Sequence, residues 1–102
     1  MVNAKEKAQK IIDENGVVVF SKSYCPYCRS TKQLLDGKKA DYFLMELDEV
    51  DDGSELQSAL AEISGQRTVP NVFISQKHVG GNSDVQALGK KLDAMLKEAG
   101  AV

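Results

Sequence analysis

The run VVVFS at Val17–Ser21 constrains the fold of this chain more than any other feature. It is short, β-branched and nearly all apolar, which is typical of a strand that helices cover on both faces of its sheet. Apolar residues recur at helical spacing before it, in residues 4–12, and a second helix is expected after it, from Pro26 to Gly37. The run therefore predicts an inner strand of an α/β sheet.

The rest of the pattern predicts an α/β fold with a four-stranded mixed sheet flanked by helices, in a single domain over residues 1–102. Helical crossovers make the first two strands parallel, and a tight turn makes the last two antiparallel. Asn3 is the expected cap of the first helix, and Gly16 its stop. The other expected strands are 41–47, 71–74 and 77–81, with a turn at Ser75 and Gln76 between the last two. Two further helices are expected to begin with capping boxes. The first has its box at Ser54/Gln57 and ends at Gly65, and the second has its box at Ser83/Gln86 and is broken at Gly89.

Composition limits the partners that the chain can have. Hydrophobic residues make up 42% and charged residues 27%, and no apolar stretch approaches the roughly eighteen residues of a membrane span. The net charge of -2 gives no overall attraction to nucleic acid or to an anionic membrane. The start of the chain lacks the apolar region of a signal peptide, so we expect a cytoplasmic protein. We also expect it to be a monomer. The acidic run at 48–53 is interpreted as a solvated loop rather than a metal site.

Cys25 and Cys28 are the only two cysteines, and they stand directly after the first strand with two residues between them. Such a pair is half of a metal site, a static disulfide or a thiol pair that is oxidised and reduced in turn. A zinc site takes four ligands, and the chain adds only His78, which is otherwise an ordinary strand residue. A disulfide across so short a loop adds little stability. The redox pair is therefore favoured, and a cluster shared between subunits stays open as a secondary property.

The two cysteines are expected to have different roles. Cys25 lies at the mouth of the helix that Pro26 begins, where unpaired backbone N–H groups and the helix dipole favour a thiolate. Lys22 and Arg29 add positive charge on either side. Cys28 lies in the first helical turn, within reach of Cys25 but more enclosed. Cys25 is thus predicted to attack, and Cys28 to resolve the resulting disulfide.

Two further stretches have features of a binding site. In GQRTVPNVFI, residues 65–74, Pro70 leaves Val69 extended beside the strand entry, where a peptide-like ligand can add backbone hydrogen bonds. An ordinary strand-entry proline explains the same pattern. In GGNSD, residues 80–84, a glycine turn leads into a helix start that can bind a carboxylate, and a simple strand-to-helix turn is the alternative. Neither stretch decides between its two explanations.

Together, CPYC at 25–28, GQRTVPNVFI at 65–74 and GGNSD at 80–84 resemble the dithiol class of glutaredoxins, with their thioredoxin-like fold, over essentially the whole chain. The wording around the motifs most resembles small eukaryotic, fungal-like members. The resemblance implies an enzyme that reduces mixed disulfides between glutathione and a protein or small thiol, as well as protein disulfides. Glutathione would be its co-substrate, and no bound cofactor or metal is implied.

The resemblance also implies a role for each matching residue. Cys25 would be the nucleophile and Cys28 the second cysteine. The remaining residues would form a glutathione groove: Lys22, Gln66 and Arg67 near the glycine carboxylate, Val69 pairing its backbone with the cysteinyl unit, Pro70 in the cis form, Gly81, Ser83 and Asp84 at the γ-glutamyl end, and Tyr27 and Thr68 along the walls.

Two functions from other classes compete with this one. A thioredoxin-like reductase served by a flavoprotein is disfavoured because the chain has no Trp and no Gly-Pro between its cysteines. A non-enzymatic iron–sulfur carrier would use Cys25 and glutathione across a dimer. The proline at Pro26 disfavours it, because cluster-binding members of the resembling family tend to lack that proline.

Overall fold

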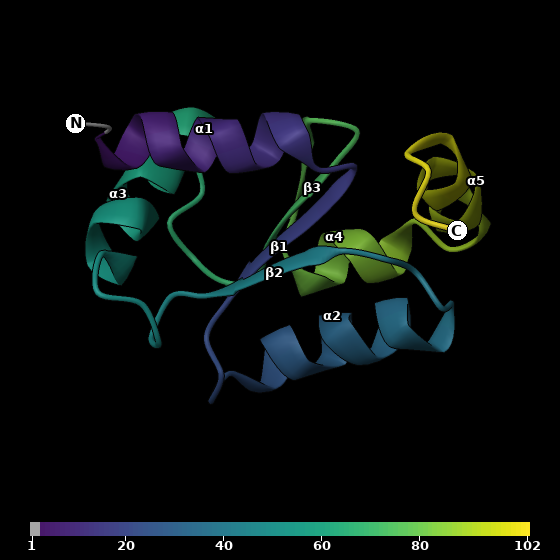
Figure 1. Ribbon diagram of the computed structural model, residues 1–102. Coiled ribbons are helices and arrows are strands. Elements are labelled where there is room, and N and C mark those ends of the chain that lie inside the picture. Colours follow the sequence, from purple (N-terminus) through teal and green to yellow (C-terminus); the bar gives the residue numbers. More distant parts are fainter. Residues whose placement is uncertain (1–2) are drawn as a thin grey trace.

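The structure, a computed structural model, describes residues 3–102. It contains one four-stranded sheet, which lies between helices (Figure 1). The strand order is β2 (Phe43–Glu46), β1 (Val17–Ser21), β3 (Asn71–Ile74) and β4 (Lys77–Gly80). β1 is parallel to β2 and antiparallel to β3, and β3 and β4 form an antiparallel hairpin. The predicted mixed sheet is confirmed, with the second strand shorter than expected.

Helices cover both faces of the sheet (Figure 1). On one face lie α1 (Ala4–Glu14) and α3 (Gly53–Ser64). On the other lie α2 (Pro26–Gly37), α4 (Asn82–Ala87) and α5 (Lys90–Glu98). No helix within residues 3–102 is long and apolar enough to cross a membrane.

Burial on both faces explains why β1 has so few polar residues. Val18 and Phe20 pack into the cluster under α1 and α3, whereas Val17 and Val19 pack into the cluster under α2, α4 and α5. Phe20 also meets Phe73 of β3 edge to face, with ring centroids 6.1 Å apart. Each such side chain contributes roughly 1.5–3 kcal/mol by leaving water. The two-sided core fixes β1 as the central strand, whose carboxyl end leads directly to Cys25.

Several predicted helix and turn signals are confirmed. Asn3 caps α1, its Oδ1 accepting a hydrogen bond from the Glu6 N–H at 2.8 Å. Gly65 ends α3 with φ of 78°, a left-handed conformation that glycine adopts without steric cost. Ser75 and Gln76 both have positive φ, 52° and 65°, as a tight hairpin turn requires.

The predicted capping box of α3 is wrong. The helix begins at Gly53, one residue before Ser54, and no side chain caps it. A Cβ at position 53 would collide with the carbonyl oxygen of Leu47, so this close approach requires glycine. The Gln57 side chain instead donates from Nε2 to the Arg67 carbonyl at 2.9 Å. It ties α3 to the segment that precedes β3.

The predicted capping box of α4 is also wrong. Gly81 is the cap residue, and the Asp84 carboxylate accepts a hydrogen bond from its N–H at 2.9 Å. Ser83 lies inside the helix. Gln86 donates from Nε2 to Ser30 and Asn82, each at 3.3 Å, and so connects α4 to α2. Gln57 and Gln86 therefore serve contacts between elements rather than the predicted local caps.

Candidate active site

Cys25 is the N-cap residue of α2. Its backbone is extended, with φ of -85° and ψ of 120°, and Pro26 occupies the first helical turn without needing an N–H partner. The Cys25 sulfur accepts a hydrogen bond from the Cys28 N–H at 3.3 Å. The sulfur therefore lies where the unpaired amides of the helix point, as predicted, and a thiolate there has a donor already in place.

Cys28 is fully buried beneath Cys25. Burial first, and then the neighbouring Cys25 side chain, raise the pKa of the Cys28 thiol to about 11, against a smaller lowering by the Lys22 backbone and the Ser21 hydroxyl. Both cysteines are free thiols. The half-buried Cys25 is therefore the sulfur that a substrate can reach, and the protonated Cys28 stands behind it.

A groove of about 510 Å³ opens beside Cys25, and the Val69 carbonyl at its edge lies 3.9 Å from the Cys25 Sγ. Eight of the twelve predicted site residues line this groove. The other four, Cys25, Cys28, Lys22 and Arg67, do not contribute to its walls. The lining residues are Tyr27, Gln66, Thr68, Val69, Pro70, Gly81, Asn82, Ser83 and Asp84.

Val69 presents an open main-chain edge to the groove. The Val69–Pro70 peptide bond is cis, as the resemblance implied. β3 begins only at Asn71, and across residues 3–102 the Val69 N–H donates to no protein acceptor. An extended ligand can therefore pair with this residue in the manner of an added strand.

Gln66 lies in the groove wall, but its side-chain amide serves the protein itself. Its Nε2 donates to the carbonyls of Thr68, at 3.0 Å, and Pro70, at 2.9 Å. Its Oε1 lies 3.2 Å from the Nε2 of His78. Since both N–H donors are occupied, Gln66 holds the loop around Val69. It has no free N–H for the glycine carboxylate that the resemblance assigned to it.

The start of α4 forms the far end of the groove. Asp84 is exposed, and one of its carboxylate oxygens is engaged by the Gly81 N–H. Asn82, which is not among the predicted site residues, also lines the groove. Its Oδ1 accepts from the buried Thr31 hydroxyl at 2.9 Å, which fixes the amide against α2. Its place inside the GGNSD motif was the signal that could have found it.

Comparison with known proteins decides the family. The model of the family described as Glutaredoxin matches residues 17–79, more than half of the chain. The chain belongs to the glutaredoxin family. It is 55% identical over 98 residues to a glutaredoxin of Vernicia fordii, covering 94% of each chain.

Two other similar proteins are informative. Glutaredoxin-C4, chloroplastic, of Oryza sativa subsp. japonica is 53% identical, covering 99% of this chain and 77% of its own. A crystal structure of the buckwheat glutaredoxin–glutathione complex superposes with a TM-score of 0.94 at 48% identity, covering 97% of this chain and 92% of that one. The thioredoxin-like fold is thereby confirmed. These relatives are plant proteins, so the expected likeness to fungal members is not confirmed.

The loop that precedes Cys25 in this glutaredoxin is held by Asp48, a residue of the acidic run. Asp48 accepts hydrogen bonds from the Ser23 N–H, at 2.9 Å, and from the Ser23 hydroxyl. These bonds, with the charge of Lys22, hold the pKa of the Asp48 carboxyl below its ordinary value. The run is a loop as predicted, but Asp48 connects it to the residues before Cys25.

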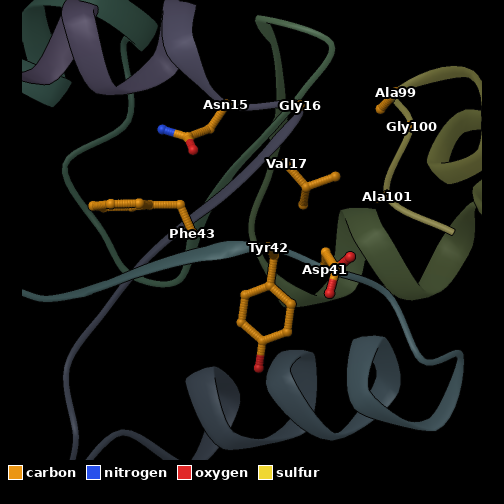
Figure 2. Close-up of a pocket in the computed structure, with 9 residues that line it drawn as sticks. All are labelled: Asn15, Gly16, Val17, Asp41, Tyr42, Phe43, Ala99, Gly100 and Ala101. Atoms are coloured by element: carbon orange, nitrogen blue, oxygen red, sulfur yellow. The ribbon is translucent and has the colours of Figure 1, made fainter.

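A second cavity, of about 320 Å³, lies at the opposite end of β1 from the cysteines (Figure 2). Gly16 and Gly100 are among its lining residues, and Figure 2 shows the Tyr42 ring pointing away from it toward α2. The Tyr42 hydroxyl donates to Asp36 of α2 at 2.9 Å. The lining of this cavity includes one carboxylate, Asp41, and no cysteine, so the cavity lacks the groups that thiol chemistry needs.

The described residues include no cluster of side chains that could bind a metal ion. Among the residues that the structure describes, no group of three or more His, Cys, Asp or Glu side chains is arranged to hold an ion. His78 instead contacts Gln66, and its ring packs 5.3 Å from that of Phe73.

Proposed function

We propose that this glutaredoxin reduces mixed disulfides between glutathione and a protein or small thiol, using Cys25 as the nucleophile and free glutathione as the reductant. One observation carries the proposal: the accessible Cys25 sulfur at the start of α2 lies beside the Val69 carbonyl, and Val69 lines an open groove. The glutathione in the complex of the similar buckwheat protein supports glutathione as the ligand.

The reaction follows from thiol–disulfide exchange. The Cys25 thiolate attacks the glutathionyl sulfur, the disulfide bond breaks, and the substrate thiolate leaves and takes up a proton. Cys25 is then joined to glutathione. The thiolate of a second glutathione attacks the sulfur of the bound glutathione, releasing glutathione disulfide and the Cys25 thiolate. In each cycle one free glutathione thiol is oxidised and one substrate thiol is released, because the other half of the glutathione disulfide comes from the substrate itself.

Protein disulfides would follow a second route. Cys25 attacks one sulfur of the protein disulfide, and Cys28 then attacks Cys25, which releases the reduced protein and forms a Cys25–Cys28 disulfide. Two molecules of glutathione reduce that disulfide. Cys28 has to lose its proton as it attacks, because burial keeps its thiol protonated at neutral pH.

The groove would orient the glutathionyl half for the first attack. The main chain of Val69 would pair with the cysteinyl unit, with Tyr27 and Thr68 along the walls and the start of α4 at the γ-glutamyl end. Lys22 and Arg67 lie outside the walls, so their contribution would be positive charge around the glycine end.

The test is turnover of a small glutathione mixed disulfide, followed as NADPH consumption through glutathione reductase. Cys25→Ser should retain less than about a hundredth of the wild-type rate, since it removes the attacking sulfur. Cys28→Ser is the matched control and should keep the activity, because the glutathione route does not use it. Activity that survives in Cys25→Ser would show that the nucleophile has been assigned wrongly.

We further propose that the protein works as a cytoplasmic monomer on glutathionylated proteins and small disulfides, without nucleic acid or membrane partners. A thiol pair that must return to its reduced form is suited to a reducing compartment. Because one relative is named chloroplastic, a fluorescent fusion of the full-length protein is the necessary check. Light scattering after gel filtration would test the monomer, and a stable dimer would contradict it.

A further inference from the structure

The amide of Gln66 has one orientation that satisfies its neighbours. Its two N–H donors meet the carbonyls of Thr68 and Pro70, at 3.0 and 2.9 Å. Turning the amide over would place its oxygen against those two carbonyls, which are acceptors like itself. The orientation shown leaves Oε1 facing His78, 3.2 Å from the ring Nε2.

That orientation also settles the role of His78. Because Gln66 presents an acceptor, the His78 Nε2 has to carry the proton and donate. The neutral tautomer protonated at Nε2 and the imidazolium both have this donor. The ring is held on β4 by packing against Phe73, with centroids 5.3 Å apart. His78 thus offers an N–H to the side-chain oxygen of Gln66.

The two carbonyls that Gln66 holds lie on either side of Val69 in the chain. Val69 is the residue whose N–H is unpaired within residues 3–102 and whose carbonyl lies 3.9 Å from the Cys25 sulfur. Its position therefore depends on contacts from its neighbours rather than on a sheet ladder. A series of hydrogen bonds runs from β4 through Gln66 to the open edge of the groove.

We infer that His78 is a positioning residue for the glutathionyl substrate, acting through Gln66 on the main chain around Val69. The inference rests on the proposed function, because it assumes that the substrate pairs with Val69. Without the His78 donor, Gln66 exchanges more readily between orientations, and the Val69 edge has to be ordered when the substrate binds. The cost falls on binding, since neither His78 nor Gln66 contacts the Cys25 sulfur.

The decisive variant is His78→Phe, which keeps a ring against Phe73 and removes the N–H donor. We expect the KM for a small glutathione mixed disulfide to rise about three- to tenfold, as expected from loss of one ordinary hydrogen bond, with kcat changed less than about threefold. His78→Gln, whose amide carries a donor, should recover part of the loss. Lys77→Ala, at the neighbouring exposed position of β4, is the matched control and should match wild type.

Two further readouts separate positioning from general damage. Alkylation of Cys25 by iodoacetamide does not use the groove, so its rate should agree with wild type within about twofold. The thermal midpoint should also be close to wild type, because His78 is exposed. A parallel fall in alkylation, stability and turnover would identify a structural role and overturn the inference.

The kinetic outcomes are distinct from those that test the function itself. No turnover by wild type would refute the proposed function. With an active wild type, an unchanged KM in His78→Phe, or no recovery in His78→Gln, would overturn the role of His78. A lower KM in His78→Phe would mean that His78 restrains Gln66 from meeting the ligand, the opposite of positioning.

Discussion

Cys25 and Cys28 have the same side chain, but their positions at the start of α2 give the two thiols different environments. Cys25 caps α2 and has an amide donor at its sulfur, whereas Cys28 is enclosed by the core and has a pKa raised to about 11. The sequence predicted this difference from Pro26 and the preceding strand alone. It did not predict how Gln66 is used, since the partners of a side-chain amide depend on which segments fold around it.

Removal of Cys28 should therefore separate the two disulfide routes. Cys28→Ser should reduce a glutathione mixed disulfide at a rate close to that of wild type, while its reduction of a protein disulfide falls at least about tenfold, because no second thiol resolves the intermediate. Insulin reduction followed by turbidity, beside the glutathione-coupled assay, would measure both. Equal losses in the two assays would refute the division of roles.

At the scale of elements, the strands and the helix stops were predictable, and the helix starts were less so. VVVFS had to be a strand because its residues fill both faces of a sheet, and Gly65 had to end α3 because of its left-handed backbone. The capping boxes failed because Gln57 and Gln86 reach other elements. A local pattern describes only local partners, whereas Gln57 bonds Arg67 and Gln86 bonds Ser30 as well as the nearby Asn82.

Gly53 gives the sharpest test at this scale. Gly53→Ala should lower the free energy of unfolding by about 1–3 kcal/mol, because the new Cβ meets the Leu47 carbonyl and the β2–α3 connection has to move. Gly37→Ala, at the end of α2, has no heavy atom within 4 Å of its new Cβ and is the control. It should be neutral or slightly stabilising. Urea denaturation of both variants measures the difference, and similar losses would contradict the steric argument.

For the whole molecule, the site is assembled from segments that only the complete fold brings together. Cys25 follows β1, Val69 precedes β3, and Asp84 belongs to α4. Eight of the residues that the resemblance assigned to a glutathione groove line one groove in the structure, because motif spacing is preserved with the fold. Asn82 and Asp48 were missed, since the contacts of the first with Thr31 and of the second with Ser23 join distant parts of the sequence.

Stability of the whole molecule at high pH should depend on Tyr42. Burial first, and then Asp36, raise the pKa of Tyr42 to about 12 from 10.0. The unfolded chain therefore loses this proton first, so the stabilisation is complete below about pH 10 and is lost as the pH rises toward 12. Tyr42→Phe should be less stable than wild type at pH 8, and the gap should narrow by pH 11. Urea unfolding of both proteins at pH 8 and pH 11 measures this difference in stability. A difference that grows with pH would contradict the prediction.

The burial of Cys28 makes the fate of glutathionylated Cys25 depend on the size of the glutathione pool. Discharge by glutathione is second order and quickens with its concentration, whereas internal attack by Cys28 has a fixed rate that the proton on its sulfur holds down. At high glutathione concentration, attack by glutathione would then be faster than attack by Cys28. At low concentration, the Cys25–Cys28 disulfide would accumulate. A single enclosed thiol would in this way make the oxidised fraction of the protein a measure of how much reductant the cell has left.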